Sequence, residues 1–303
     1  MIVVTGATGH TGGEIARQLL KKGKTVRALG RDTARLADLE KLGAQVLAGE
    51  PDDPDYLTRA FTGASAVYAM VPPAMTSSDY RGFQQRVAGA QAQALRRAGV
   101  KQVVALSSVG AHLTEQGGVV QGLHDMEQLF SAVPDLKACY LRPTYFMENL
   151  LNQIPLIQHA GITGSPIRAD LKLNMVATQD IAAAAVDLLE SGAWEAGEVR
   201  YLLGARDFTM GEMAGIVGRA VGRPELPYVE IPAEQFRQAL VQQAGLSPDV
   251  ADRMNEFMAS LNAGRILEGA ARTPQSTTAT TLEAFATQVI APAYAAMAQH
   301  PQD

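Results

Sequence analysis

The sequence predicts an α/β protein in which a doubly wound parallel sheet carries a smaller, mostly helical C-terminal region. Three observations predict this fold. Short, nearly continuous apolar runs alternate with helix-like segments over residues 1–141. A glycine-rich turn joins the first apolar run to the first helix pattern. Finally, Gly23, Gly43, Gly63 and Gly99 follow helix patterns at the place where a left-handed cap belongs.

The predicted elements of this sheet follow in a regular order. Six apolar runs predict strands buried on both faces: Ile2–Thr5, Thr25–Leu29, Ala44–Leu47, Ala66–Val71, Gln102–Leu106 and Leu136–Leu141. Five segments with helical periodicity lie between them: Gly13–Lys22, Thr33–Leu42, Pro54–Phe61, Asp79–Ala98 and Gln121–Ala132. Strands alternating with helices imply right-handed crossovers, and therefore helices on both faces of the sheet.

The second half of the chain is less regular. Residues 161–166 are typical of a turn, Thr178–Glu190 of a helix with Thr178 as its N-cap, and Glu198–Leu203 of a seventh strand. Later helices are predicted at Met210–Val221, Ala233–Ala244 and Pro248–Leu261, and the polar run 276–281 predicts a loop before a last helix.

Composition excludes several classes of protein. The 303 residues are 47% hydrophobic and 19% charged, as in ordinary soluble globular proteins, and the net charge of -5 gives no basic footprint for nucleic acid. Cys139 is the one cysteine, so no disulfide framework, cysteine cluster or metal site is predicted. We find no signal-peptide pattern and no apolar stretch long enough to span a bilayer, and we expect a cytoplasmic protein without membrane contact.

The turn after the first strand has the spacing G-x-x-G-x-x-G. Gly6 permits the tight turn, Gly9 lets a diphosphate approach the backbone, and Gly12 lets the helix close on the sheet. Free amides at a helix N-terminus bind anions, and the strand–turn–helix context makes the motif specific for a dinucleotide. The predicted phosphate contacts are Gly6, Thr8, Gly9, His10, Thr11 and Gly12.

The end of the second strand predicts which dinucleotide binds. A carboxylate usually stands there to hold the ribose of NAD, whereas this chain has Gly30 followed by Arg31. A guanidinium can pair with a 2′-phosphate and Gly30 leaves room for it, so we predict NADP(H). The alternative is that Arg31 is a solvated charge and Asp32 takes the ribose of NAD(H).

Other strand ends supply further candidates for cofactor binding. Glu50 follows the third strand and can reach the adenine edge, although a turn with Asp53 as helix N-cap is an equal alternative. Met70, Val71 and Pro72 end the fourth strand as a stiff wall. Ser107 ends the fifth strand, where the crevice of such a sheet lies; capping of the strand is its alternative role.

The proton donor of ordinary short-chain dehydrogenases is missing, because none of the candidate tyrosines is followed by Lys in a Tyr-x-x-x-Lys pattern. The residues that are present resemble the NmrA-like branch of the atypical short-chain dehydrogenases. The resemblance rests on residues 5–12, 26–31 and 106–110, and above all on Leu141–Asn149, and it covers most of the chain. It implies a Rossmann core and either an NAD(P)H-dependent reductase or a dinucleotide-sensing regulator.

Site residues beyond the cofactor loop follow from this resemblance. His124 lies about where related ether reductases carry a catalytic lysine, so it is the candidate proton donor, with a helix cap or surface residue as the alternative. Tyr145 is the second catalytic candidate, and Phe146 and Asn149 join it in the predicted substrate site. Tyr145 and Phe146 have core packing as their alternative.

These observations together predict a function and a division of the chain. We predict an NADP(H)-dependent oxidoreductase that passes hydride to a small apolar acceptor such as a quinone. Hydride transfer to a quinone gives a stabilised phenolate, so it depends less on proton delivery by the protein. The alternatives are a non-catalytic NAD(P)-sensing regulator that binds a protein partner and, last, a sugar-nucleotide epimerase. Residues 1–150 and 176–204 are predicted to form the dinucleotide core, and 151–175 and 205–303 the substrate region, in a monomer or homodimer.

Overall fold

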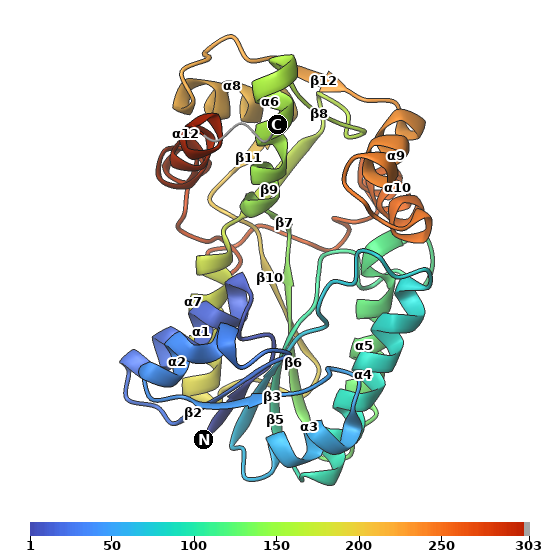
Figure 1. Ribbon diagram of the computed structural model, residues 1–303. Coiled ribbons are helices and arrows are strands. Elements are labelled where there is room, and N and C mark those ends of the chain that lie inside the picture. Colours follow the sequence, from blue (N-terminus) through green and yellow to red (C-terminus); the bar gives the residue numbers. More distant parts are fainter. Residues whose placement is uncertain (300–303) are drawn as a thin grey trace.

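The computed structural model describes residues 1–299 and contains one large parallel sheet with a second, smaller region above it (Figure 1). The sheet order is β10-β6-β5-β4-β1-β2-β3, which is the doubly wound order of dinucleotide-binding folds with an extra strand. Its strands are β1 (Ile2–Val4), β2 (Val26–Gly30), β3 (Gln45–Ala48), β4 (Ala66–Ala69), β5 (Gln102–Leu106), β6 (Lys137–Pro143) and β10 (Glu198–Leu202). The predicted fold class is confirmed.

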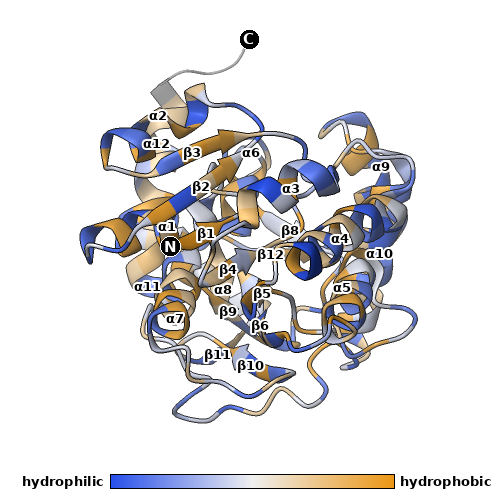
Figure 2. Cartoon of the chain, turned by 90° about the horizontal axis from the view of Figure 1, so that it is seen from below, coloured by the Kyte–Doolittle hydropathy of each residue, from blue (hydrophilic) through white to orange (hydrophobic). Residues whose placement is uncertain are grey.

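Helices cover both faces of the sheet (Figure 2). The helices α1 and α2 pack on one face with α7, while α3, α4 and α5 pack on the other. Their bounds are α1 (His10–Lys21), α2 (Ala37–Lys41), α3 (Pro54–Phe61), α4 (Tyr80–Arg97), α5 (Gln121–Ser131) and α7 (Thr178–Ser191). Burial of both faces explains why most of these strands are continuous apolar runs.

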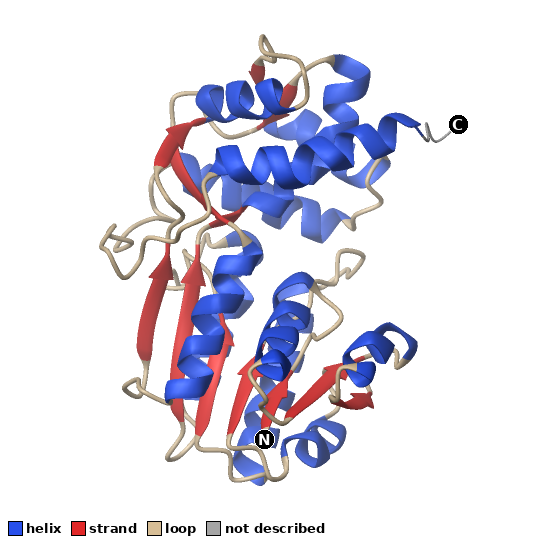
Figure 3. Ribbon diagram, turned by 90° about the vertical axis from the view of Figure 1, so that its left-hand side faces the viewer, coloured by secondary structure: helices blue, strands red, loops and turns tan. Residues whose placement is uncertain are grey.

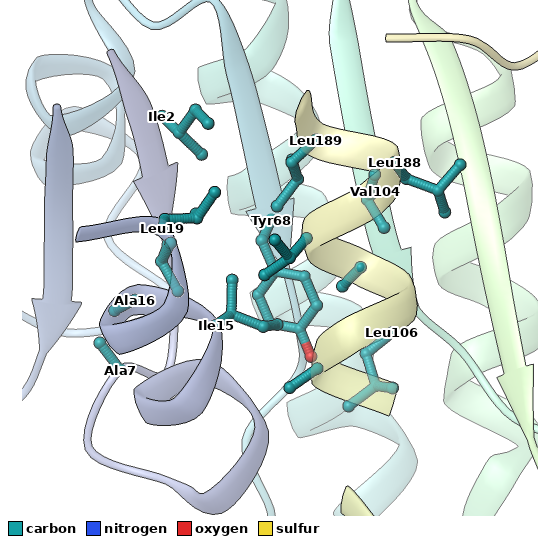
Figure 4. Packing of buried hydrophobic residues seen from close by; sticks show 14 of the residues in the cluster. Ile2, Ala7, Ile15, Ala16, Leu19, Tyr68, Val104, Leu106, Leu188 and Leu189 are labelled. Carbon is teal, nitrogen blue, oxygen red and sulfur yellow. The ribbon is translucent and has the colours of Figure 1, made fainter. Parts of the chain in front are cut away.

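The buried centre of the sheet illustrates this packing. Tyr68 on β4 is fully buried and lies with Ile15 and Leu19 of α1 and with Leu188 and Leu189 of α7 in one cluster (Figure 4). Cys139 of β6 is buried, and burial raises the pKa of its thiol to about 12. A thiol in that state is not a nucleophile at neutral pH.

The smaller region stands above the carboxyl ends of the large sheet's strands (Figures 1 and 3). It holds a three-stranded sheet, β11-β9-β7, and a parallel pair, β12-β8. The strands are β7 (Tyr145–Phe146), β8 (Thr163–Ser165), β9 (Lys172–Val176), β11 (Asp207–Thr209) and β12 (Tyr228–Glu230). The helices are α6 (Ile154–Ala160), α8 (Met210–Ala220), α9 (Ala233–Gln242), α10 (Pro248–Asn262), α11 (Leu282–Phe285) and α12 (Ala291–Gln299).

Four sequence predictions about local structure were wrong. The first helix begins at His10 rather than Gly13, and β3 is a largely exposed edge strand rather than a buried one. The N-cap of α7 is Ala177, because the hydroxyl of Thr178 donates to Glu148 instead of capping its own helix. Residues 161–166 contain β8. Within residues 1–299, no helix is long and apolar enough to cross a membrane.

Candidate functional site

The turn between β1 and α1 leaves backbone amides available. Gly9 is the N-cap of α1, its own amide donates to Gly6 O at 2.9 Å, and the first bond within the helix runs from Gly13 N to Gly9 O at 3.0 Å. The amides of His10, Thr11 and Gly12 therefore have no carbonyl one turn earlier in the helix to bond. Together with the helix dipole, they make this end of α1 suitable for an anion.

The three glycines of the turn differ in what a side chain at each position would meet. Gly6 has a φ of +61°, and a Cβ there would lie 2.6 Å from Met70 Sδ. A Cβ on Gly12 would lie 2.5 Å from Gly6 O, so only glycine lets α1 pack this closely on the turn. A Cβ on Gly9 would meet Gly6 O at an ordinary 3.4 Å, and Gly9 itself is exposed. Contacts among the described residues therefore do not require glycine at position 9.

Two neighbouring cavities, of about 350 and 90 Å³, open beside this turn, and we call them together the glycine-loop groove. They share the lining residues Arg31, Pro51 and Pro72. Six of the residues predicted from the sequence to bind the cofactor line them: Gly6, Thr8, Arg31, Glu50, Met70 and Pro72. The other predicted residues of the turn, Gly9, His10, Thr11 and Gly12, are at the adjoining start of α1, and Val71 and Ser107 line neither cavity.

Arg31 is the charged residue that lines both cavities, and its side chain is exposed. None of the ion pairs among residues 1–299 involves Arg31, whereas Asp32 Oδ1 accepts a hydrogen bond from Ala34 N at 2.8 Å. Asp32 is thus turned toward its own backbone. Gly30 lines the smaller cavity, and a Cβ there would lie 2.9 Å from a methyl carbon of Thr8. Glycine at this position therefore makes room for Thr8, and the space for a 2′-phosphate beside it stays a prediction.

The acidic turn after β3 serves two purposes. Asp53 caps α3, accepting from Asp55 N at 2.9 Å and Tyr56 N at 3.0 Å, as the alternative interpretation of this turn predicted. Glu50 and Asp52 line the larger cavity together with Pro72 and Pro73.

A second group of polar residues lies where β5 and β6 end, and we call it the Glu127 cluster: Ser107, Glu127, Tyr140, Arg142 and Tyr201. Arg142 Nη2 lies 2.6 Å and Nε 2.9 Å from the two carboxylate oxygens of Glu127. Ser107 Oγ donates to Glu127 Oε1, and Arg142 donates to the hydroxyl of Tyr201 at 3.3 Å. Ser107, Glu127 and Arg142 are all buried. Burial alone would lower the pKa of Arg142, but its interactions with Glu127 and then with Tyr201 outweigh burial and raise that pKa.

His124 lies one helical turn before Glu127 on α5. Its Nδ1 is 2.9 Å from the carbonyl oxygen of Ala111, and since a carbonyl only accepts, Nδ1 carries the proton. The next residue, Asp125, receives two hydrogen bonds from Arg81, at 2.8 and 2.9 Å. The hydrogen bond from Arg81 lowers the pKa of Asp125.

The predicted substrate residues stand just beyond β6. Tyr145 and Phe146 form β7, opposite Met175 and Val176 of β9, and Asn149 lies in the 3-10 turn that follows. All three are partly exposed. Burial raises the pKa of Tyr145 to about 12. Tyr145 therefore keeps its proton at neutral pH.

A family model described as the NmrA-like family matches residues 1–286. The chain belongs to the NmrA-like family. Among curated relatives, an NAD(P)H azoreductase of Xenophilus azovorans is 30% identical over 259 residues, covering 86% of each chain. A (4-alkanoyl-5-oxo-2,5-dihydrofuran-3-yl)methyl phosphate reductase of Streptomyces griseus is 32% identical over 255 residues, covering 83% of this chain and 84% of the relative. Among solved structures, the NADPH complex of quinone oxidoreductase QOR2 of Escherichia coli has the same fold, with a TM-score of 0.76 at 24% identity, covering 96% of this chain and all of that one.

Two features of this NmrA-like chain escaped the sequence analysis. Glu127 and Arg142 were not predicted as a pair, although a charged residue at the end of an apolar strand, as Arg142 is, needs a partner when buried. Gln91 was also missed, and it lines the smaller cavity from α4. The sequence gives no signal for Gln91, because what distinguishes this residue is that one atom of its side-chain amide is bonded and the other is not.

Proposed function

We propose that this protein is an NADP(H)-dependent oxidoreductase that transfers hydride to a small apolar acceptor such as a quinone. The glycine-loop groove carries the proposal: amides left free by the turn adjoin cavities lined by an unpaired arginine. Two relatives that match most of the chain support the same activity: both are reductases by name, and the name of one includes NAD(P)H.

The residues of the groove fit a phosphorylated dinucleotide. The amides of His10, Thr11 and Gly12 would hold the diphosphate, and Arg31 would pair with a 2′-phosphate, since Asp32 is engaged with its own backbone. Glu50 would face the adenine edge, with Met70, Val71 and Pro72 as the wall at the end of β4. When bound, the dinucleotide supplies the hydride. The protein itself would hold the nicotinamide and the acceptor close together and correctly oriented.

His124 is the proposed proton donor. With Nδ1 bonded to Ala111 O, the imidazolium form carries its second proton on Nε2, the one ring atom left to give it away. Tyr145, Phe146 and Asn149 are proposed to contact the acceptor, with Tyr145 orienting it as a neutral phenol because its pKa is about 12. Ser107 is proposed to face the cofactor, and the region of residues 151–175 and 205–303 to bind substrate.

The test combines binding with turnover. Calorimetry should show tighter binding of NADPH than NADH, and Arg31→Ala should raise Kd for NADPH at least about tenfold, or about 1.4 kcal/mol, with little change for NADH. Arg59→Ala, on an exposed side chain of α3, is the matched control. Equal affinities for the two coenzymes would reject the NADP(H) assignment.

Turnover is measured as NADPH oxidation with a panel of quinones, imines and aldehydes. His124→Ala should lower kcat with little effect on Kd for NADPH, whereas Gln128→Ala, at an exposed position of the same helix, should change neither. Tight binding of NADPH without turnover of any acceptor would remove the enzyme and leave a dinucleotide sensor.

A further inference from the structure

Gln91 is a buried polar residue on α4 with half of its amide unused. Its side chain is 1% exposed, and Nε2 donates to the carbonyl oxygen of Met70 at 2.9 Å. Oε1 is also buried and has no hydrogen-bond partner among the residues described. The residue lines the smaller cavity of the glycine-loop groove, together with Gly6, Gly30 and Arg31.

The orientation of this amide is set by its partner. Met70 O can only accept, so the NH₂ group must face it and Oε1 is left as an acceptor. An acceptor kept from water without a partner costs free energy, and native proteins pair such atoms with protein, water or ligand. Gln91 therefore calls for a hydrogen-bond donor from whatever fills the cavity.

The chemistry of the proposed cofactor narrows the choice of donor. Phosphate oxygens accept and would be repelled by Oε1. The adenosine half of NADPH has two kinds of donor, the ribose 3′-hydroxyl and the adenine amino group. The cavity is walled by Gly30 and Arg31 at the end of β2, which is where the ribose lies in sheets of this type.

We propose that Gln91 Oε1 accepts a hydrogen bond from the 3′-hydroxyl of the adenosine ribose and so recognises the cofactor from the α4 side. This inference rests on the proposed function. It assigns ribose recognition to a residue some 60 positions after β2, in a chain whose Asp32 accepts a hydrogen bond from its own backbone and lines neither cavity. Gln91 positions the adenosine half and does not touch the reacting atoms.

The test uses adenosine 2′,5′-bisphosphate and its 3′-deoxy analogue as calorimetric probes, with NADPH as the reference ligand. The wild-type protein should bind the deoxy compound at least about tenfold more weakly, in line with the loss of one buried hydrogen bond. In Gln91→Met both probes should bind weakly and equally. Inosine 2′,5′-bisphosphate is the third probe, because it lacks the adenine amino group.

Gln84→Met is a closely matched control. Gln84 lies seven residues earlier on α4, is also buried, donates Nε2 to Val119 O at 3.1 Å and has an unpaired Oε1, but it lines neither cavity. It should keep the wild-type ratio between the two adenosine probes. The comparison of probes on the wild-type protein stands even if Gln91→Met does not fold.

Each outcome has a distinct meaning. Equal wild-type affinity for the two adenosine probes, with NADPH still bound, would overturn the Gln91 assignment alone. The opposite pattern is that the inosine probe binds the wild-type protein more weakly than the adenosine probe, with no such difference in Gln91→Met. That result would assign the contact to the adenine amino group and overturn the ribose assignment. Failure to bind NADPH or NADH at all would reject the proposed function and this inference together.

Discussion

The glycine-loop groove and the Glu127 cluster lie at the carboxyl ends of strands in the same sheet, and they use polar groups in opposite ways. At the groove, the first amides of α1, the Arg31 guanidinium and Gln91 Oε1 have no hydrogen-bond partner within residues 1–299. In the cluster, Ser107 and Arg142 are both bonded to one carboxylate.

This difference suggests that the groove binds a ligand and that the cluster stabilises the fold. Groups that stay unpaired at a cavity are available to a ligand, whereas groups paired with each other in the interior stabilise or orient the structure around it. Substitutions in the groove should therefore appear mainly in Kd, and substitutions of the buried pair Glu127 and Arg142 mainly in the free energy of unfolding. The experiments below test that separation, beginning with the largest expected effect.

Removal of Glu127 should give that largest effect. Glu127→Leu leaves Arg142 buried at 8% exposure without its carboxylate, which should lower the free energy of unfolding by about 3–5 kcal/mol. The double variant Glu127→Leu/Arg142→Met should be more stable than the single one, because no buried charge remains unpaired. Urea unfolding measures both, with Kd for NADPH measured on the folded fraction.

A loss below about 1 kcal/mol for Glu127→Leu would show that the pair is hydrated and not a support. A loss of NADPH affinity in a fully folded double variant would place the Glu127 cluster in the binding site and end the separation.

The glycines of the turn beside the groove offer a second comparison. Gly12→Ala puts a Cβ 2.5 Å from Gly6 O and should cost about 1–3 kcal/mol of stability. Gly9→Ala meets nothing closer than 3.4 Å and should leave stability within about 0.5 kcal/mol, yet weaken NADPH binding at least about tenfold because its methyl occupies the path of the diphosphate.

Gly89→Ala on α4 serves as the control, since a Cβ there meets nothing within 4 Å and should stabilise the helix slightly. If Gly9→Ala bound NADPH as well as the wild-type protein does, the anion would not be approaching over Gly9.

The sequence predicted the first of these regions far better than the second. Strand runs, glycine spacing and the residues at strand ends are local patterns, and they identified the sheet, the turn and Arg31 without any contact information. The Glu127 cluster joins α5 to the ends of β5 and β6, and residues 15 and 20 positions apart carry no local signature of their pairing.

The upper region was predicted least well for a similar reason. Its strands β7, β8, β11 and β12 are two or three residues long, too short for an alternating pattern to show. Strand β9 has five residues but pairs with segments some 30 positions away on either side, so its neighbours could not be assigned. The same distance effect concealed Thr178, whose partner Glu148 is 30 positions earlier.

The smallest expected effect on the free energy of unfolding comes from the partly exposed ion pair of Arg81 with Asp125, which lies next to His124 on α5. Because the pKa of Asp125 is lowered in the folded protein, the unfolded chain takes up its proton first as pH falls. The stabilisation by this pair is therefore complete above the ordinary pKa of about 4 and is lost as pH falls below it. Both side chains are partly exposed, so we expect only about 0.5–1 kcal/mol.

Urea unfolding between about pH 2.5 and 7 measures this contribution: Asp125→Asn should lower stability at neutral pH and flatten its decline in acid. Asp38→Asn, which removes an exposed partner of Lys41, is the control. If the free energy of unfolding of Asp125→Asn declined as steeply in acid as that of the wild-type protein, the pair of Arg81 and Asp125 would contribute no stability. Stabilising pairs on α5 would then include Glu127 but not Asp125, and His124 would lie beside a solvated carboxylate.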